Sequence, residues 1–293
     1  MSMKRRRFLF IAAAAAFSGA ARAENTTWQT DMLGGTVRVD LRGTRGLAQD
    51  IVGRIGSTIA EVEAAASLFK TGSALSRLNA AGHLDDPPPA LLDLLRLANH
   101  VHQATAGRFD PTVQPLWRAL AQARDVTEAQ AAIGWERVRI EPSIQLAHGQ
   151  ALTLNGIAQG YAADRVRRLL LEEGYAQAFV DMGEFAAIGG PFSVAVEDPA
   201  LGQIATRRLA GNAIATSSPS AMMLGTGFHI LGPRGERPCW STISVEAESA
   251  AMADGFSTAF CLMTRDEIRA TLRRVPGITR VTAVDEAGDV STF

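Results

Sequence analysis

Apolar and polar residues alternate over positions 36–41, which predicts a half-buried β-strand near the start of the chain. Positions 46–69 instead carry an apolar stripe with helical spacing, so this segment is predicted to form an amphipathic helix. The stripe consists of Ile51, Ile55, Ile59 and Val62. The same two periods predict helices at 90–106, 116–124, 127–133, 156–174, 253–260 and 265–274. They predict strands at 138–140, 151–154, 178–180, 192–196, 214–216, 229–231, 242–247 and 279–284.

Helices and strands are therefore interleaved, but they do not follow a regular strand–helix–strand series. No GxGxxG motif follows the first strand and no GxxxxGK[ST] motif occurs, so dinucleotide-binding and P-loop folds are disfavoured. No internal repeat or shift in composition divides the chain after residue 23. We therefore predict a single α+β domain over residues 24–293, with mixed sheets and packed helices.

The first 23 residues are predicted to be an export signal outside this fold. Lys4-Arg5-Arg6-Arg7 precedes an apolar, alanine-rich run at 8–16, and Ala21-Arg22-Ala23 provides a small-x-small cleavage site. The apolar run is too short to span a bilayer, so the mature chain has no predicted transmembrane segment. Residues 5–9 fit the twin-arginine pattern, although Lys4 stands where Ser or Thr is usual, so general secretory export also stays open. The expected location is the periplasm.

Composition narrows the classes of partner. Without the five basic residues of the signal, the chain carries 24 basic and 30 acidic residues, which argues against nucleic acid or an anionic membrane as a partner. Only two cysteines are present, so no disulfide framework holds the fold. Cys239 and Cys261 can pair in an oxidising compartment, although Cys261 has the setting of a core thiol. The absence of CxxC, HExxH and His clusters makes zinc or iron chemistry unexpected.

A candidate cation site lies in the apolar run 253–260. Asp254 and Thr258 are four residues apart, so a helix places this carboxylate and this hydroxyl on the same face. Hard oxygen donors on a largely buried helix suit a small, hard cation such as Mg²⁺. The alternative is an Asp that caps an ordinary core helix. Gly156 and Gly160 would allow close approach of the backbone to a metal or phosphate, or would simply mark the start of a helix.

Six short motifs occur in order over about residues 32–263. Two of them are Gly107-Arg108-Phe109-Asp110-Pro111-Thr112-Val113-Gln114-Pro115-Leu116 and Leu154-Asn155-Gly156-Ile157-Ala158-Gln159-Gly160-Tyr161-Ala162-Ala163-Asp164. The others are Ser73-Ala74-Leu75-Ser76-Arg77-Leu78-Asn79, Ala215-Thr216-Ser217-Ser218, His229-Ile230-Leu231-Gly232-Pro233-Arg234 and residues 253–260. Together these motifs resemble those of the ApbE family of FAD:protein FMN transferases.

This resemblance implies an ApbE-like domain that binds FAD and a divalent cation, usually Mg²⁺. Such enzymes split the FAD pyrophosphate, transfer FMN through a phosphoester to a Thr or Ser of a client flavoprotein, and release AMP. The family's metal ligands correspond to the side chains of Asp254 and Thr258 and to the backbone carbonyls of Gly156 and Ser257.

Proton transfer is assigned to His229, because imidazole can accept a hydroxyl proton near neutral pH. A structural His at the start of a strand is the alternative. Side chains at turns and strand ends are the candidates for contact with the flavin nucleotide, with local turn capping as the alternative for each. These candidates are Asp110, Thr112, Gln159, Asp181, Thr216 and Ser217.

The chain departs from the family pattern at several positions. Gln159 replaces a Lys whose charge could face phosphate, and Gly232 replaces an Asp. Thr153 and Asn155 replace an Asp and a Gly, and the family's Gly-Gly-Asn/Asp turn reads Gly183-Glu184-Phe185. Such divergent exported members resemble the NosX branch, which is associated with maturation of nitrous oxide reductase and implies a membrane flavoprotein as client. A catalytically weak FAD carrier and a metal-dependent FAD pyrophosphatase remain as alternatives.

Overall fold

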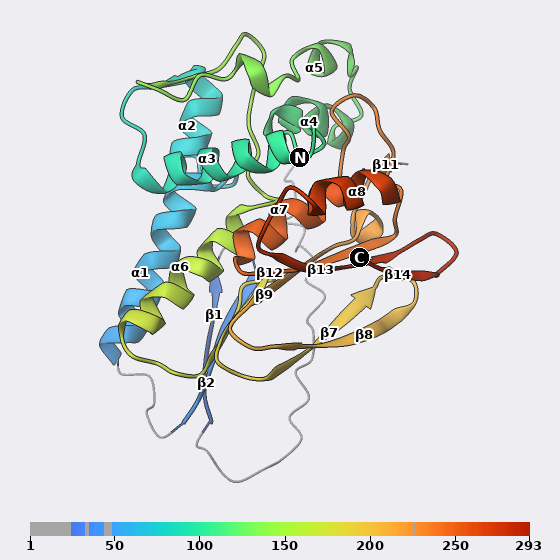
Figure 1. Cartoon of the computed structure of the whole chain (residues 1–293). Coiled ribbons are helices and arrows are strands. Elements are labelled where there is room, and N and C mark those ends of the chain that lie inside the picture. Colours follow the sequence, from blue (N-terminus) through green and yellow to red (C-terminus); the bar gives the residue numbers. More distant parts are fainter. Residues whose placement is uncertain (1–24, 33–34, 44–48, 226) are drawn as a thin grey trace.

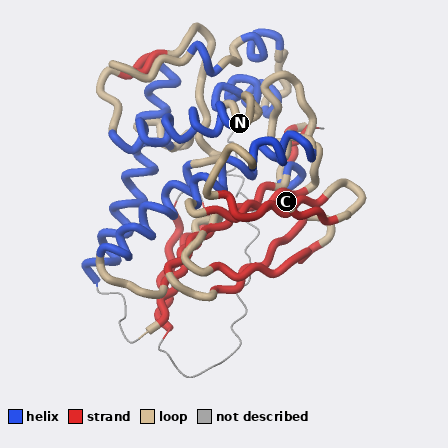
Figure 2. The backbone as a smooth tube through the Cα atoms, in the orientation of Figure 1, coloured by secondary structure: helices blue, strands red, loops and turns tan. Residues whose placement is uncertain are grey.

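The framework of the computed structural model is an eight-stranded sheet in which every neighbouring pair is antiparallel (Figures 1 and 2). The structure describes residues 25–32, 35–43, 49–225 and 227–293, so the predicted export signal at 1–23 lies outside the described residues. In spatial order the strands are β1 (Asn25–Met32), β2 (Gly35–Arg42), β5 (Ala178–Asp181), β6 (Phe185–Ile188), β9 (Ala213–Ser217), β12 (Thr242–Ala247), β13 (Ile278–Val284) and β14 (Val290–Thr292).

Three two-stranded sheets complete the β structure. They pair β3 (His83–Leu84) with β4 (Ile144–Gln145), β7 (Phe192–Asp198) with β8 (Gly202–Leu209), and β10 (Met223–Leu224) with β11 (Gly227–Phe228). The short 3-10 helices are η1 (Pro111–Val113), η2 (Trp135–Arg137) and η3 (Pro219–Ala221).

Helices cover one face of the large sheet (Figure 1). The helices are α1 (Gln49–Ala66), α2 (Ala74–Ala81), α3 (Pro89–Ala104), α4 (Gln114–Ala121), α5 (Thr127–Ala131), α6 (Ala158–Glu172), α7 (Ala250–Phe260) and α8 (Arg265–Leu272). The helices α6 and α7 pack directly on the strands, while α1 packs on α6 and α3 packs on α7. None of the helices in the described ranges combines the length and hydrophobicity that a membrane span needs.

The central strands are apolar on both faces because both faces are covered. Ala178 and Val180 of β5 join the large core beneath the helices, whereas Phe179 joins a second core under the β7–β8 hairpin. The Phe179 ring stacks on Phe185 and Phe192, with centroid separations of 5.5 and 5.4 Å. Alternate side chains along these strands therefore point to opposite faces, and this decides which of them reach α7.

The predicted α+β fold class is confirmed, and most predicted elements are present. Three predicted strands are wrong. Residues 151–154 form no strand, because the side chain of Asn79 takes the backbone N–H and carbonyl of Leu152, at 2.7 and 2.8 Å. Residues 138–140 contain only an isolated bridge from Arg139 to Gln145, and residues 229–231 form a loop after β11. The sequence patterns do not predict β1, β6, β8 or α2.

Both cysteines are free thiols; Cys239 is exposed and Cys261, at the end of α7, is buried. Burial raises the pKa of the Cys261 thiol, as expected for a core thiol. The Cys239 N–H donates to the Cys261 carbonyl at 2.8 Å, so the two residues are neighbours in space. Their pairing in an oxidising compartment stays a prediction.

Candidate functional site

The site forms where the start of α6 meets the middle of α7, and two glycines permit this approach. A Cβ atom on Gly160 would lie 2.3 Å from the Ala250 carbonyl oxygen, and one on Gly156 would lie 2.8 Å from Thr258 Oγ1. The Gly160 N–H donates to Asp254 Oδ2 at 3.2 Å, so the carboxylate faces the positive end of α6. The motif at 154–164 and the motif at 253–260 therefore form one structural unit.

Gly160→Ala should lower the free energy of unfolding by about 3 kcal/mol, because the new methyl group would meet backbone that cannot move aside. Thermal unfolding of the metal-free protein measures the loss. Gly53→Ala is the matched control: it lies in α1, nothing lies within 4 Å of the added Cβ, and we expect a gain of about 0.5–1 kcal/mol. Equal effects at the two positions would contradict the close approach of α6 and α7.

Oxygen atoms gather on the face of α7 that points toward the end of β9. Ser217 Oγ lies 2.7 Å from Ser257 Oγ and 3.4 Å from Thr258 Oγ1, and Ser257 Oγ donates to the Asp254 carbonyl at 2.9 Å. Asp254 is only 3% exposed, and this burial raises the pKa of its carboxyl group to about 7, against the lowering effect of the Gly160 N–H. Asp254 and Thr258 both lie in α7, so their four-residue spacing places them on the same face of this helix.

These residues fit a hard divalent cation. Among the described residues, Asp254 Oδ1 accepts no hydrogen bond although its side chain is almost fully buried. Gly156 leaves open the space beside the Thr258 hydroxyl that a Cβ would fill. The donors are all oxygens, and no cluster of three or more His, Cys, Asp or Glu side chains suited to a metal occurs in the described ranges. The predicted ligand Ser257 differs in one respect, because its carbonyl accepts the Cys261 N–H at 3.3 Å within α7.

His229 is fixed in one orientation by the loop that follows β9. Its Nδ1 lies 2.9 Å from the Pro219 carbonyl and 3.1 Å from the Met222 carbonyl, so we assign the ring proton to Nδ1. This leaves the lone pair on Nε2 as a proton acceptor. Burial lowers the pKa of His229 below 6.5, so the ring is neutral at pH 7. Pro219 follows Ser217 by two residues, so the segment that holds the His229 ring also carries Ser217.

Comparison with known proteins identifies the family, because residues 28–282 match the ApbE family model. The chain belongs to the ApbE family. A relative from Salmonella typhimurium, named FAD:protein FMN transferase, is 26% identical over 246 residues, which cover 71% of this chain and 69% of the relative. A relative of the same name from Escherichia coli (strain K12) is 24% identical over 246 residues, with the same coverage.

Solved ApbE structures share the fold. The flavin transferase ApbE from Vibrio cholerae has a TM-score of 0.81 and 22% identity, covering 93% of this chain and 97% of that chain. The apo form of the Pseudomonas stutzeri flavinyl transferase ApbE has a TM-score of 0.80 and 22% identity, covering 94% and 96%. The likeness confirms the ApbE-like architecture.

Two predicted flavin contacts of the ApbE motifs lie on the other face of the sheet. Thr216 alternates with Ser217, and its hydroxyl donates to Ser244 Oγ at 2.9 Å, away from α7. Asp181 pairs across the strands with Arg38, and burial raises the pKa of this carboxyl group to about 6. The structure therefore does not bring these two side chains to Asp254, whereas Ser217 does reach its face of α7.

The ApbE motif at 107–116 lies against the loop that contains Gly156. Phe109 packs beside Gly156, and the Pro111 carbonyl accepts the Thr153 N–H at 2.9 Å. Asp110 Oδ1 accepts the N–H and the hydroxyl of Thr112, at 2.8 and 2.5 Å. Thr112 is fully buried, and its hydroxyl also accepts the Gly134 N–H, so this side chain holds the turn. Gln159, at the second position of α6, is partly exposed near the site, and contact of these residues with flavin stays a prediction.

The departure at Gly232 has a structural cause. A Cβ at this position would lie 2.6 Å from both the Cβ and the carbonyl oxygen of Glu236. Glu236 is held there by Arg108 at 2.7 Å and by Arg234 at 2.9 Å. The folded-back Glu236 therefore occupies the space that a side chain at 232 would need, and the departure follows from this loop packing.

Sequence reasoning missed Glu184 as a site residue and treated it only as a departure from the ApbE turn. It precedes β6, is 9% exposed, and its Oε2 accepts the Thr216 N–H at 3.3 Å. Burial raises the pKa of Glu184 well above its ordinary value, and the nearby Asp254 carboxylate raises it further. The signal available in the sequence was an acid directly before an apolar strand.

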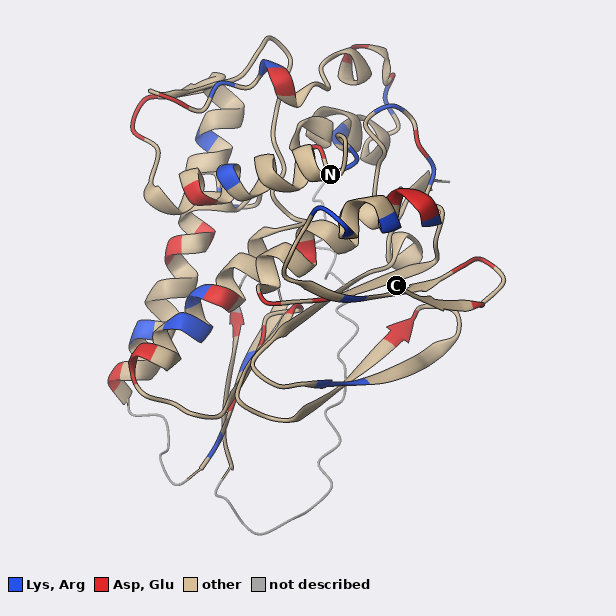
Figure 3. Ribbon diagram, viewed as in Figure 1, with Lys and Arg blue, Asp and Glu red and all other residues tan. Residues whose placement is uncertain are grey.

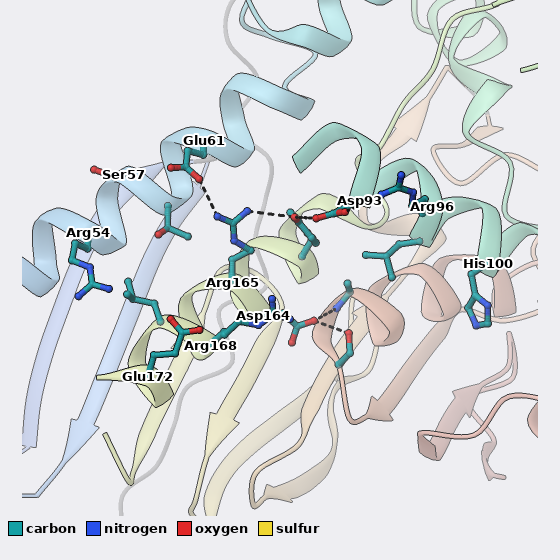
Figure 4. A pocket seen from close by; sticks show the side chains of 16 residues that line it. Arg54, Ser57, Glu61, Asp93, Arg96, His100, Asp164, Arg165, Arg168 and Glu172 are labelled. Carbon is teal, nitrogen blue, oxygen red and sulfur yellow. Dashed lines mark hydrogen bonds and ion pairs between the residues drawn. The ribbon is translucent and has the colours of Figure 1, made fainter. Parts of the chain in front are cut away.

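A groove of about 880 Å³ lies between α1, α3 and α6, on another side of α6 (Figure 4). Within it, Arg165 contacts Glu61 at 2.9 Å and the Tyr161 hydroxyl at 3.4 Å. Asp164 reaches the start of α7 and accepts the Ala250 and Ala251 N–H groups at 3.0 and 2.9 Å. Figure 3 shows basic and acidic residues together along the ribbons of α1 and α6, and residues of both signs line the groove, so it does not offer a field of one sign.

Proposed function

We propose that this chain is an Mg²⁺-dependent FAD:protein FMN transferase that modifies a Thr or Ser of a client flavoprotein. The observation that carries the proposal is the junction of α6 and α7, where the buried Asp254 and the partly buried Thr258 and Gly156 offer oxygen ligands at the positive end of a helix. The names of the Salmonella and Escherichia relatives support the same reaction.

The proposed reaction forms a bond from the client hydroxyl oxygen to the phosphorus on the flavin side of the pyrophosphate, and it breaks the bond to AMP. Asp254 and Thr258, with the Gly156 carbonyl, would hold Mg²⁺, which when bound offsets the charge that grows on the phosphate oxygens. The start of α6 favours the anionic pyrophosphate at the same place. His229 Nε2 accepts the proton that leaves the client hydroxyl.

We also propose that the chain acts in the periplasm after export, by the twin-arginine route. The basic, apolar and small-residue segments of residues 1–23 support this. The client would be a membrane flavoprotein that faces the periplasm, and the signal together with the divergence at Gln159 supports the NosX role in nitrous oxide reductase maturation and denitrification. Periplasmic recovery of a chain that begins at Glu24 tests the export step, and cytoplasmic retention of the uncleaved chain would contradict it.

Mass spectrometry of a candidate client domain, incubated with the mature protein, FAD and Mg²⁺, tests the reaction. We expect the client to gain the mass of one FMN joined through a phosphoester, with release of one AMP. Free FMN and AMP with an unmodified client would instead indicate a pyrophosphatase. Intact FAD recovered from the protein would indicate a flavin carrier, the alternative that Gln159 favours because a phosphate-facing Lys is missing there.

A further inference from the structure

Glu184 lies on the same face of the sheet as the candidate cation site. Phe185 and Ala187 of β6 face the second core, whereas Ala186 faces the helices. Glu184 lies in the bend directly before β6, and its carboxylate reaches across to the end of β9. Its Oε2 accepts the backbone N–H of Thr216, the residue beside Ser217, whose hydroxyl contacts Ser257 and Thr258. The Glu184 carboxylate therefore lies near the same segment of α7 as Asp254, close enough for the Asp254 charge to raise the pKa of Glu184.

The two carboxylates have no cation to balance them in the described part of the chain. Neither Glu184 nor Asp254 forms an ion pair there, although both are at least nine-tenths buried. Each uses one oxygen for a single backbone N–H, at 3.3 and 3.2 Å, and the other oxygens, Glu184 Oε1 and Asp254 Oδ1, accept no hydrogen bond from described residues. Ionising both of these adjacent, buried carboxyl groups is costly, as their raised pKa values show, unless a positive charge lies between them.

We propose that Glu184 is a second carboxylate ligand of the divalent cation at Asp254. This inference rests on the cation site of the proposed function. Two carboxylates cancel the charge of a divalent ion, so the ion binds before the nucleotide and needs no phosphate oxygens to complete its charge balance. A neutral residue at position 159 is compatible with this ligand set, because a cationic side chain there would compete with the metal ion for the two carboxylates.

Binding of Mn²⁺ to the flavin-free protein, followed by the loss of the free-ion signal in electron paramagnetic resonance, tests this role. Mn²⁺ takes the same hard oxygen ligands as Mg²⁺. Glu184→Gln keeps an oxygen for the Thr216 N–H and removes only the charge, and we expect it to weaken Mn²⁺ binding at least about tenfold. Glu184→Asp restores the charge one methylene short and should bind more tightly than the Gln variant. Glu136→Gln, whose side chain is 75% exposed, is the control and should bind as the wild type does.

Thermal unfolding adds a second measurement, in which the substitution that weakens metal binding should stabilise the metal-free protein. In EDTA and at alkaline pH, where both carboxyl groups ionise, Glu184→Gln should raise Tm above that of the wild type, because the repulsion with Asp254 is gone, while added Mg²⁺ should raise its Tm less. A Glu184→Gln variant that is less stable than the wild type in EDTA would indicate a merely structural role and overturn the proposal.

The metal titration separates this inference from the proposed function. Weakened binding in both Asp254→Asn and Glu184→Gln supports Glu184 as a ligand. Loss of binding in Asp254→Asn with wild-type affinity in Glu184→Gln overturns the Glu184 proposal and leaves the cation site standing. Wild-type affinity in both variants overturns the Glu184 proposal and also removes the cation site at Asp254. No binding of Mn²⁺ to the flavin-free wild type overturns the Glu184 proposal alone.

Discussion

Asp254→Asn should reduce FMN transfer at least about a hundredfold while the protein stays folded, because a metal-bound oxygen charge at a phosphoryl centre contributes on the order of 3 kcal/mol. Asparagine offers the same oxygen to the Gly160 N–H, so the contact between α6 and α7 survives. What disappears is the negative charge that would hold Mg²⁺. Client labelling by mass spectrometry and AMP release both measure the effect.

A matched substitution controls for the loss of one negative charge. Asp266 lies in the first turn of α8 with a side chain that is 94% exposed, so Asp266→Asn should transfer FMN at the wild-type rate. Circular dichroism of each variant should match that of the wild type. Normal transfer by a folded Asp254→Asn variant would remove Asp254 from the catalytic centre and with it the metal assignment.

His229→Gln should lower the transfer rate by roughly 10²–10⁴-fold, the usual contribution of a positioned base, while FAD binding is kept. The pH profile gives the sharper result. Since burial lowers the pKa of His229 below 6.5, the wild-type rate should be level around pH 7–8 and fall on the acid side with a midpoint below 6.5. Protonation at Nε2 removes the acceptor, and Nδ1 already donates to backbone carbonyls.

The acid limb of the profile should be absent from His229→Gln, whose residual rate would no longer follow this ionisation. His83→Gln serves as the control, because His83 is exposed on the short strand β3 and its replacement should leave rate and profile unchanged. A His229→Gln variant with the wild-type rate and acid limb would mean that another group takes the proton.

The arrangement of the candidate cation site was predictable because it depends on one local rule. Asp254 and Thr258 are four residues apart in an apolar run, and any helix over that run places them together. The motifs around Gly156 and Gly160 were predictable as sites of close approach for the same reason, since glycine permits contacts that a Cβ forbids.

The sheet residues were harder to assign because β5, β6 and β9 are covered on both faces. Their sequences lack the alternation of apolar and polar residues that tells which face a side chain occupies. Asp181 and Thr216 were therefore expected at the site but face away from α7, while Glu184 was overlooked although it faces Asp254. Only the pairing of β6 with β9 shows this, and pairing between distant segments is not written in local periodicity.

The order of strands in the sheet also sets the timing of folding during synthesis. Strand β2 pairs with β5, where Arg38 lies opposite Asp181, about 140 positions further along the chain. At roughly 5–20 residues per second, a ribosome needs on the order of ten seconds to bridge that interval. During this time β1 is the only strand of the finished sheet that can pair with β2. The apolar residues of β2 that are buried in the finished protein are Val37, Val39 and Leu41. Until then these apolar side chains lack the neighbouring strand that β5 provides in the finished sheet.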